Sequence, residues 1–587
     1  MKKDVIFAIN GPIITVKNTQ AFFVLEMVYV GVKRLMGEVI SINQHETIIQ
    51  VYESTTGLKP QEPVEGSGQL FSIQLGPGLV GNIYDGIGRP LNTIADQTQS
   101  AFIPTGAHTS TISMKKSWPI TILIKEGQTV HGGMIVAHIQ ETSSIVHRVL
   151  IPSDISGSVE SVYQGETITM QDVLAVVVNP QTKQSFTLYA YQVCAIKQPR
   201  RIHQRLPIST PLITGQRVVD ALFPIAKGGT AAMPGGFGTG KTMMQHQLAK
   251  WSDADLIVYI GCGERGNEMT QALEEFSHLQ DPRTQQPLLD RTILIANTSN
   301  MPVAAREASI YTGITIAEYY RDMGYHVAVM ADSTSRWAEA LREISGRLEE
   351  MPAEEGFPAY LSSRISQFYE RAGLVETLNH DTGSVTIIGA VSPQGSDFSE
   401  PVTQNTKRFV RAFWALDKNL AYARHYPAVN WNLSYSEYLD SLTNWYNKEV
   451  DVEFIPTVKK IRTLLAEEGK LLEITKLIGQ DVLPDDQKLV ILMGKLIRES
   501  FLQQNAYHQN DSYVPLKKQL KMMQVLLYLY TVLQQYIKQE HALSNILKQP
   551  IFEKILKLKY TIPNDDFSGF DAINAEIDHL LIIKVRV

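Results

Sequence analysis

Cysteine is nearly absent, with only Cys194 and Cys262 among 587 residues. Neither lies in a C-x-x-C pair or a Cys/His group, which argues against a disulfide framework and against a zinc site built on thiolates. The sequence also lacks any run of 18 or more apolar residues, so we expect no segment that spans a bilayer. The first residues, MKKDVIFAINGPIITV, alternate in polarity and contain Gly and Pro, unlike a signal peptide. A reducing cytoplasm fits these absences best.

An excess of positive charge is missing as well. Lys and Arg number 54 against 60 Asp and Glu, for a net charge of −6, so no global basic field attracts nucleic acid. Hydrophobic residues at 44% and charged residues at 19% are typical of a globular protein. At this length one hydrophobic core does not suffice, and about four domains are expected.

The residue patterns of successive segments predict a multidomain α/β protein. Short β-rich runs over residues 1–75 predict a small closed β-barrel. Residues 76–117 begin with a Gly/Pro-rich boundary and lead into a nucleotide-binding domain. In residues 191–435 apolar strands alternate with helical stretches, which predicts a doubly wound domain. Leu, Lys and Glu at helical spacing predict a helical bundle over residues 436–587.

Residues 118–190 form a β-rich insert with two similar strand–Gly–strand passages. This weak repeat resembles biotinyl and lipoyl carriers, which need an exposed lysine between the two halves. No lysine lies between Lys125 and Lys183. We therefore expect a purely structural insert.

A glycine-rich stretch carries the strongest chemical signal. GGFGTGKT fits the phosphate-binding pattern GxxxxGK[ST], follows a strand-like TAAM and leads into a helix. Its backbone amides are expected to converge on phosphates at the positive end of the helix dipole. Lys241 would contact the β- and γ-phosphates, and Thr242 would bind Mg²⁺. A chance match is the alternative. The predicted nucleotide-binding residues here are Gly235, Gly236, Phe237, Gly238, Thr239, Gly240, Lys241 and Thr242.

Two further segments offer the groups that ATP hydrolysis requires. HVAVMAD is an apolar strand ending in Asp332, as expected of a carboxylate beside the magnesium ion, although Asp332 would also suit a helix cap. IVYIGCGERGNEM places Glu264 and Arg265 just after another buried strand. Glu264 would polarise the attacking water and Arg265 would lie beside the γ-phosphate. The alternative is that Glu264 and Glu268 only favour a helix N-terminus.

Six motifs in this order closely resemble the catalytic A subunit of V-type and archaeal-type rotary ATPases: MPGGFGTGKT, IVYIGCGERGNEM, NTSNMPVAARE, VMADSTSRWAEALREIS, FPAYL and YPAVNW. The resemblance runs nearly end to end and includes the insert. It implies a RecA-like nucleotide-binding domain and assigns Lys241, Thr242, Glu264, Arg265 and Asp332 the roles given above. By the same resemblance Arg336 is a further nucleotide-binding candidate, and Tyr426 and Phe501 match aromatic positions that enclose the adenine. The alternative for these two aromatic residues is an ordinary place in the core.

The resemblance also implies an assembly. Catalytic chains alternate with non-catalytic B subunits in a hexamer around central shaft subunits, with peripheral stalk subunits and a membrane rotor that conducts protons or sodium ions. The implied place is the cytoplasmic face of a membrane, where the chain is peripheral. We expect ATP or ADP with Mg²⁺ as ligands and an arginine supplied in trans by a B subunit. The isolated chain should bind nucleotide and hydrolyse it poorly.

Two departures from the family pattern stand out. Gly236 replaces the usual Pro, which removes a φ restraint from the loop. Thr239 stands where eukaryotic relatives carry Cys, which favours a bacterial or archaeal type. Two other functions remain open at this point. A hexameric helicase or terminator would need basic channel loops and a nucleic-acid-binding barrel, and a non-catalytic ring subunit would bind nucleotide without turnover.

Overall fold

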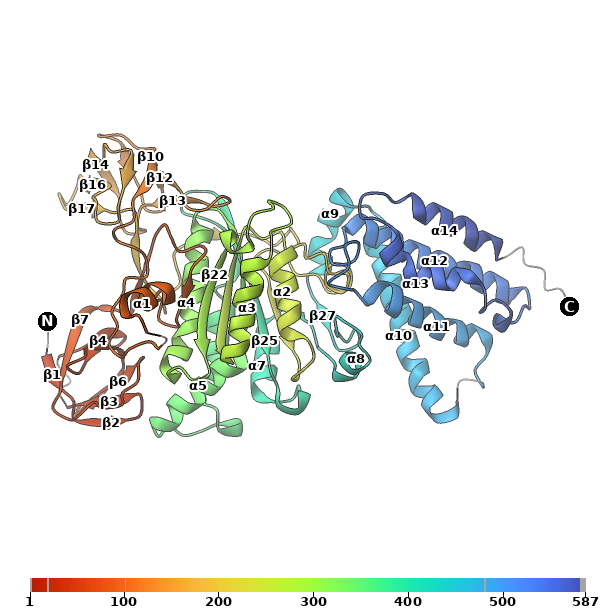
Figure 1. Ribbon diagram of the computed structural model, residues 1–587, viewed down its shortest axis with the longest axis horizontal. Helices are drawn as coiled ribbons and strands as arrows, with labels where there is room; N and C mark the ends of the chain where they lie inside the picture. Colours follow the sequence, from red (N-terminus) through yellow and green to blue (C-terminus); the bar gives the residue numbers. More distant parts are fainter. Residues whose placement is uncertain (1–2, 18–20, 101, 480–481, 581–587) are drawn as a thin grey trace.

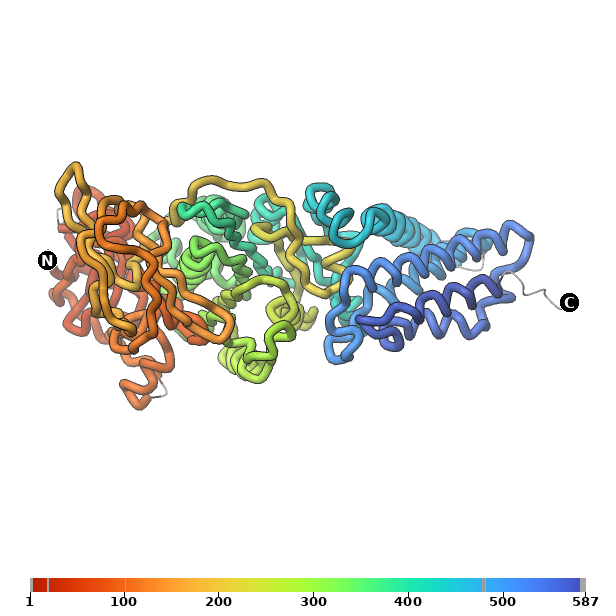
Figure 2. The backbone as a smooth tube through the Cα atoms, turned by 90° about the horizontal axis from the view of Figure 1, so that it is seen from above, coloured from red at the N-terminus to blue at the C-terminus, as the bar shows by residue number. Residues whose placement is uncertain are grey.

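The computed structural model describes residues 3–17, 21–100, 102–479 and 482–580. The molecule is elongated, with the N-terminal β-rich parts at one end and the C-terminal helices at the other (Figure 1, Figure 2). A mixed α/β domain lies between them and joins the two ends. This arrangement confirms the predicted fold class.

The N-terminal part is a seven-stranded antiparallel sheet in the order β1-β7-β4-β5-β6-β3-β2. Strands β1 and β2 are successive pieces of one extended stretch, so the two edges of the sheet meet and the sheet closes into a barrel. Alternate residues of β4 are buried, which gives the barrel its own small core. The strands are β1 (Lys3–Val5), β2 (Ala8–Asn10), β3 (Ile13–Val16), β4 (Glu26–Val30), β5 (Leu35–Ile42), β6 (Thr47–Val51) and β7 (Pro63–Leu70).

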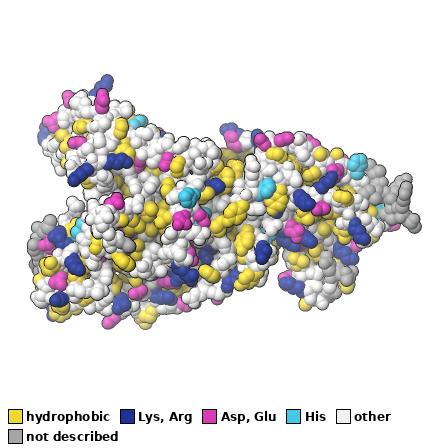
Figure 3. All heavy atoms as spheres, viewed as in Figure 1, with side chains coloured by type: hydrophobic (Ala, Val, Ile, Leu, Met, Phe, Trp, Pro, Cys, Tyr) yellow, Lys and Arg dark blue, Asp and Glu magenta, His cyan; other side chains and the backbone are white. Residues whose placement is uncertain are grey.

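The insert is built of two four-stranded sheets, β13-β12-β10-β15 and β11-β14-β16-β17. It projects beside the barrel, and on the face shown in Figure 3 a notch separates the two. After the insert, β18 (Gln192–Ala195) pairs with β8 (Ser72–Leu75), which returns the chain to the barrel's exit. The strands of the insert are β10 (Trp118–Ile122), β11 (Thr129–Val130), β12 (Ile135–Gln140), β13 (Val146–Leu150), β14 (Gly157–Val162), β15 (Thr167–Ile168), β16 (Ala175–Val178) and β17 (Ser185–Leu188).

A buried polar cluster fastens the insert to the central domain. The Glu141 carboxylate accepts hydrogen bonds from the Val80 amide at 3.0 Å and from the Tyr320 hydroxyl at 2.9 Å. His147 lies 3.2 Å from Glu141 and 3.1 Å from the Tyr319 hydroxyl. Burying these groups is tolerated because each has a partner. The insert is therefore seated on the central domain rather than tethered by a linker alone.

The central sheet carries the parallel strands that the sequence predicts. Its order is β27-β26-β20-β25-β23-β21-β22-β9, with β24 and β19 attached beside β25. Strand β9 joins from residues that precede the insert, so the insert interrupts this domain. The strands are β9 (Ile83–Tyr84), β19 (Gln204–Arg205), β20 (Thr230–Pro234), β21 (Leu256–Glu264), β22 (Thr292–Thr298), β23 (His326–Asp332), β24 (Gly373–Glu376), β25 (Thr382–Val391), β26 (Ala412–Phe413) and β27 (Tyr435–Ser436).

Helices cover both faces of this sheet. Buried residues of β21 and β23 alternate between a core shared with α4 and α5 and a second core shared with α2 and α3. The pattern is that of parallel strands buried on both faces, which read as continuous apolar runs. The helices are α1 (Leu91–Thr98), α2 (Lys241–Trp251), α3 (Gly266–His278), α4 (Val303–Asp322), α5 (Thr334–Arg347), α6 (Leu361–Tyr369), α7 (Pro401–Phe409) and α8 (Lys418–Tyr422).

The C-terminal part is helical, and its core is continuous with the α2/α3 side of the sheet. The helices are α9 (Leu439–Glu449), α10 (Phe454–Ile478), α11 (Asp485–Leu496), α12 (Leu516–Lys538), α13 (Pro550–Thr561) and α14 (Ser568–His579), with a π-helical turn over Ile497–Leu502. None of the helices in the described ranges combines the length and apolar character needed to cross a membrane.

Candidate active site

The glycine-rich loop connects β20 to α2 at the carboxyl edge of the central sheet. Gly240 has a φ of +85° and directly precedes the helix, so the first turn of α2 opens toward the loop. At Gly236 a Cβ atom would lie 2.2 Å from Ser396 Oγ and 2.6 Å from Lys418 Cε. The space that a side chain would occupy there is thus taken by two other segments. Packing is therefore a second reason for a glycine at position 236, beside the loop mobility that the sequence predicts.

Lys241, the first residue of α2, turns its side chain back into the loop. Its Nζ donates to the carbonyl oxygens of Gly235 at 2.6 Å and Gly236 at 3.1 Å. Burial lowers the pKa of Lys241 from its ordinary value. The loop therefore holds this ammonium group at the place where the sequence predicts phosphate binding.

Thr242 and Asp332 meet across the loop. The Thr242 hydroxyl donates to Asp332 Oδ2 at 3.1 Å, and the Tyr259 hydroxyl donates to the same oxygen at 3.2 Å. Asp332 does not cap α5, because Ser333 occupies the N-cap position and no side chain caps that helix. Burial raises the pKa of Asp332, with Lys241 opposing the shift. The hydroxyl and carboxylate oxygens are hard donors of the kind that Mg²⁺ takes, so this pair fits the predicted ion.

Glu264 comes from the strand beside Asp332. Strands β21 and β23 are parallel neighbours, with Gly261 opposite Asp332, so both carboxylates reach the same edge of the sheet. Burial raises the pKa of Glu264, and the nearby Asp332 and Glu268 raise it further. Glu268 lies in the first turn of α3, as the alternative interpretation of this segment requires. Glu268 can thus favour the start of α3 while Glu264 lies at the same edge of the sheet as Asp332.

Two arginines lie near this edge of the sheet. Arg265 is the N-cap residue of α3, and its guanidinium group lies 5.5 Å from the centre of the Phe237 ring. Phe237 is 81% exposed, so the loop offers its ring as a platform for that cation. Arg336, in the first turn of α5, forms an ion pair with Glu339 at 2.8 Å. Both arginines line the same cavity as Lys241.

This phosphate cavity has a volume of about 680 Å³. Its wall contains every predicted phosphate-side residue from Gly236 onward, together with Glu264, Arg265, Asp332 and Arg336. Arg306 and Lys418 also line it and were missed by sequence reasoning. Arg306 stands in the motif NTSNMPVAARE, and its buried Nε has no hydrogen-bond partner among the described residues. An unpaired buried donor of this kind suits an anionic ligand.

A second cavity of about 450 Å³ adjoins the first at Gly240, which lines both. Tyr426 lines it and is 42% exposed, as expected of a ring available for stacking. Tyr507 and Tyr560 line it as well. Tyr507 was missed by sequence reasoning, although it stands in the motif ESFLQQNAYH that drew attention to Phe501.

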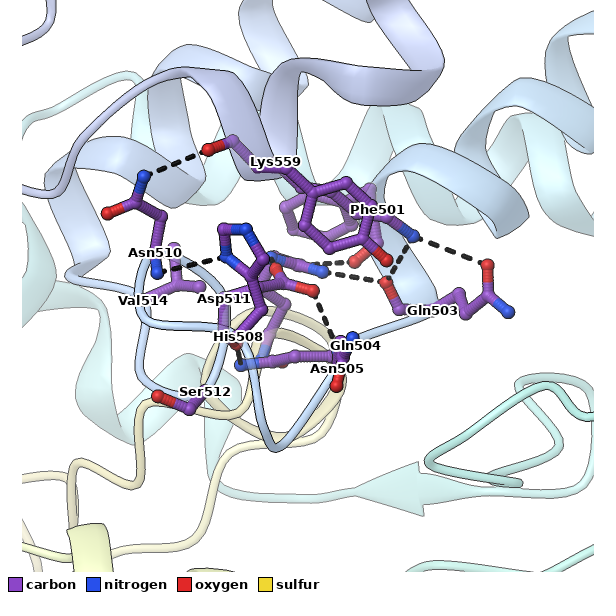
Figure 4. Close-up of polar contacts among 12 residues, drawn as sticks. Phe501, Gln503, Gln504, Asn505, His508, Asn510, Asp511, Ser512, Val514 and Lys559 are labelled. Atoms are coloured by element: carbon purple, nitrogen blue, oxygen red, sulfur yellow. Dashed lines mark hydrogen bonds and ion pairs between the residues drawn. The ribbon is translucent and has the colours of Figure 1, made fainter.

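The structure places Phe501 outside this second cavity. Its ring is 0% exposed, within the π-helical turn, and it lies 5.9 Å from the Arg217 guanidinium group. The next residues, 503–507, line the cavity instead. Figure 4 shows how polar contacts hold this segment: Asn505 donates its backbone N–H to the Asp511 carboxylate at 2.7 Å, and Lys559 donates to the Gln503 carbonyl at 3.0 Å. Phe501 therefore supports the cavity wall from the core.

Four family profiles match the chain in order. They describe the ATP synthase alpha/beta family β-barrel domain at residues 6–68, the ATP synthase alpha/beta subunit barrel-sandwich domain at 109–192 and the ATP synthase alpha/beta family nucleotide-binding domain at 215–436. The fourth is the C-terminal domain of V and A type ATP synthase at 443–547. A solved structure, the assembled ATPase EscN from an enteropathogenic E. coli type III secretion system, superposes with a TM-score of 0.62. It is 22% identical, covering 89% of this chain and 100% of that chain, and supports the RecA-like fold alone.

Curated relatives agree over almost the whole length. The V-type ATP synthase alpha chain 2 of Clostridium tetani is 55% identical over 97% of this chain and 96% of its own. The V-type ATP synthase alpha chain of Halothermothrix orenii is 53% identical over 98% of both. The corresponding A subunit of the A-type ATP synthase of Methanopyrus kandleri is 50% identical over 96% of this chain and 95% of its own. The chain belongs to the family of V-type ATP synthase alpha chains and A-type ATP synthase A subunits.

Proposed function

We propose that this chain is the catalytic subunit of a rotary ATPase and that it hydrolyses or synthesises Mg·ATP in the phosphate cavity. The observation that carries the proposal is the convergence of Lys241, Thr242, Glu264 and Asp332, from three separate elements, on one cavity. Together they meet three requirements of phosphoryl transfer: Lys241 is a cation for the phosphates, Thr242 and Asp332 are oxygen ligands for the metal, and Glu264 is a carboxylate for the water.

Nucleotide binding divides between the two adjoining cavities. The amides of the loop and the start of α2 face the phosphates, and Lys241 leaves the Gly235 and Gly236 carbonyls to contact them. Arg306 and Lys418 add positive charge to the same wall. The base enters the second cavity, where Tyr426 and Tyr507 offer aromatic faces. Gly240 at the junction allows the nucleotide to pass close to the backbone.

Thr242 and Asp332 are the residues that would hold Mg²⁺. When bound, the ion neutralises charge that builds up on the β- and γ-phosphates. Arg265 and Arg336, which line the same cavity, add to this neutralisation.

Glu264 orients the attacking water and accepts its proton. In the ligand-free chain, burial and two neighbouring carboxylates raise the pKa of Glu264, so the group there holds a proton at neutral pH. Cations in the occupied site would lower this pKa and leave the carboxylate ionised, able to accept the proton of the water. Arg336 opposes the shift and favours the ionised form that can accept a proton. The remaining charge on the transition state is met by an arginine from a neighbouring chain, which contributes roughly 10³ to 10⁵ in rate.

We infer the assembly from the family to which the chain belongs. The chain alternates with non-catalytic B subunits in a ring, contacts central shaft and peripheral stalk subunits, and lies peripherally on the cytoplasmic face of the membrane. Partner subunits carry the proton or sodium ion. On the face shown in Figure 3, basic and acidic side chains are interspersed, which does not favour the competing proposal of a nucleic-acid motor.

The test compares the purified chain alone with the chain reconstituted with its B subunit. We expect the chain alone to bind one Mg·ADP and to turn ATP over slowly, and we expect the rate to rise by orders of magnitude on reconstitution. Stimulation by RNA or DNA in place of the B subunit would overturn the proposal in favour of a helicase. A reconstituted ring whose turnover is unaffected by Lys241→Ala would assign catalysis to another chain.

A further inference from the structure

Two histidines and a glutamate gather on the surface of the central domain, remote in the sequence from the nucleotide-binding loop. His203 precedes β19, Glu376 ends β24, and His380 lies in the turn that leads to β25. Strands β19 and β24 pair antiparallel, with Gln204 opposite Glu376. One ligand atom from each of the three side chains falls within 4.8 Å of the other two. Both histidines are exposed, so this cluster is open to solvent.

The cluster is held in place by its backbone. The His203 N–H donates to the Glu376 carbonyl at 3.0 Å, and the His380 N–H donates to the Thr377 carbonyl at 3.0 Å. A strand pairing and a tight turn thus fix the three Cα positions before any ligand arrives. Such preorganisation lowers the entropy cost of binding.

The side chains are oriented as well. His380 Nδ1 lies 2.8 Å from Glu376 Oε1, and Gln204 Nε2 donates to Glu376 Oε2 at 2.6 Å. The two imidazole rings meet edge to face with their centres 4.8 Å apart. An ordinary surface ion pair explains the contact of His380 with Glu376, and the pairing of β19 with β24 adds the His203 ring as a third possible ligand.

We infer that His203, Glu376 and His380 form a binding site for a divalent transition metal of the Zn²⁺ class. Two imidazole nitrogens and one carboxylate oxygen are a common ligand set for zinc, and a fourth position is left for water. Two atoms bound to one zinc ion at 2.0–2.1 Å lie about 3.3 Å apart, so ligand atoms that now lie within 4.8 Å of one another need to approach by about 1.5 Å at most. Imidazole ligands select against Mg²⁺, which separates this site chemically from the nucleotide site.

The location gives the site a structural consequence. The turn that carries His380 also touches the insert: the Asn379 side-chain oxygen accepts from the Ile135 N–H at 3.3 Å, and Leu378 packs against Gly133. His203 lies on the segment by which the chain returns from the insert. A bound metal ion would therefore tie that returning segment to the turn on which the insert rests. It would stabilise the seating of the insert and raise the thermal stability of the chain.

The experiment is a calorimetric titration of the metal-stripped full-length chain with ZnCl₂, in excess Mg·ADP so that the nucleotide site is saturated. We expect one zinc ion per chain, with affinity reduced about tenfold or more in His203→Ala and in His380→Ala. His45→Ala, which removes an exposed histidine of the barrel, is the matched control and should bind zinc as the wild type does. Substoichiometric Co²⁺ should give the visible absorption of imidazole-ligated cobalt in the wild type and in His45→Ala only.

A second measurement separates binding from folding. Without metal, both histidine variants should melt at the wild-type temperature, because the replaced side chains are exposed. With excess Zn²⁺ the melting temperature should rise in the wild type and not in the variants. Zinc binding that is absent from the wild type, or that survives unchanged when both histidines are replaced together, would overturn the inference.

Discussion

Arg217 and Asp511 form an ion pair that is fully buried between the nucleotide-binding domain and the helical domain. The same guanidinium group donates to the Gln503 carbonyl at 2.8 Å and to the carbonyl of Phe501. Asp511 in turn accepts from the Asn505 amide at 2.7 Å. One pair thereby fixes the segment that forms a wall of the second cavity and joins two domains at that wall.

Removing one partner of this pair should destabilise the whole chain. Asp511→Ala leaves the Arg217 charge buried without its partner, which costs about 3–5 kcal/mol. Urea denaturation of the purified chain measures this loss. Glu553→Ala, which breaks an exposed ion pair with Lys557 on α13, should change stability little. Equal losses in the two variants would contradict the role given to the buried pair.

Tyr507 and Phe501 should respond differently to substitution. Tyr507→Ala removes an exposed ring from the second cavity and should weaken ADP binding by about 1–2 kcal/mol, or roughly tenfold, while Tyr507→Phe keeps the ring and the affinity. Phe501→Leu should lower stability and leave the cavity wall in place, because its ring is in the core. Calorimetric titration with Mg·ADP measures the affinity of the variants, and thermal melting measures the stability of Phe501→Leu. A larger affinity loss in Phe501→Leu would refute the assignment.

A side chain at position 236 should impair the loop for a steric reason. In Gly236→Ala the new methyl group falls 2.2 Å from Ser396 Oγ, and relieving that clash costs about 1–3 kcal/mol. We expect nucleotide affinity to fall about tenfold and to recover in Gly236→Ala combined with Ser396→Gly, because the other close atom, Lys418 Cε at 2.6 Å, belongs to a flexible side chain that can move aside. Gly346→Ala, where a Cβ meets nothing within 4 Å, serves as the control. If the double variant does not recover affinity, the loss in Gly236→Ala comes from a change in loop mobility and not from a steric clash.

The raised pKa of Glu264 predicts a pH dependence of stability. In the folded, ligand-free chain the pKa of Glu264 rises to about 9 from an ordinary 4.5, so the folded state holds a proton that the unfolded state has lost. Its contribution to stability is complete below pH 4.5 and is lost as the pH rises toward about 9. Glu264→Gln cannot titrate and avoids this loss.

Denaturation in the presence of a chelator should therefore show Glu264→Gln gaining stability relative to the wild type as the pH is raised from about 5 to about 9. Glu274→Gln, at an exposed position of α3, controls for the general effect of removing a carboxylate. A difference between Glu264→Gln and the wild type that is constant with pH would contradict the environment described for Glu264.

Local motifs were the part of the site that the sequence could predict. The stretch from Gly235 to Thr242 is one continuous piece between a strand and a helix, so the local pattern of residues is enough to identify it. Glu264 and Asp332 were each identified separately. Their meeting depends on β21 and β23 being neighbours in the sheet, which no spacing along the chain encodes.

Contacts between distant segments were beyond prediction. Lys418 reaches the loop from α8, and only the folded chain brings it beside Gly236. Phe501 and Tyr507 stand in one short motif, and the choice between them depends on where the π-helical turn ends and how Asp511 holds the next segment. The cluster of His203 with His380 arises in the same way, from the pairing of β19 with β24.

The most direct test of catalysis is single-turnover ATP hydrolysis by the reconstituted ring carrying Glu264→Gln, measured beside Mg·ADP affinity. We predict a rate lower by about two to four orders of magnitude, with affinity essentially unchanged, because the variant keeps the phosphate contacts and loses the base. Wild-type hydrolysis in that variant would contradict the claim that Glu264 activates the water.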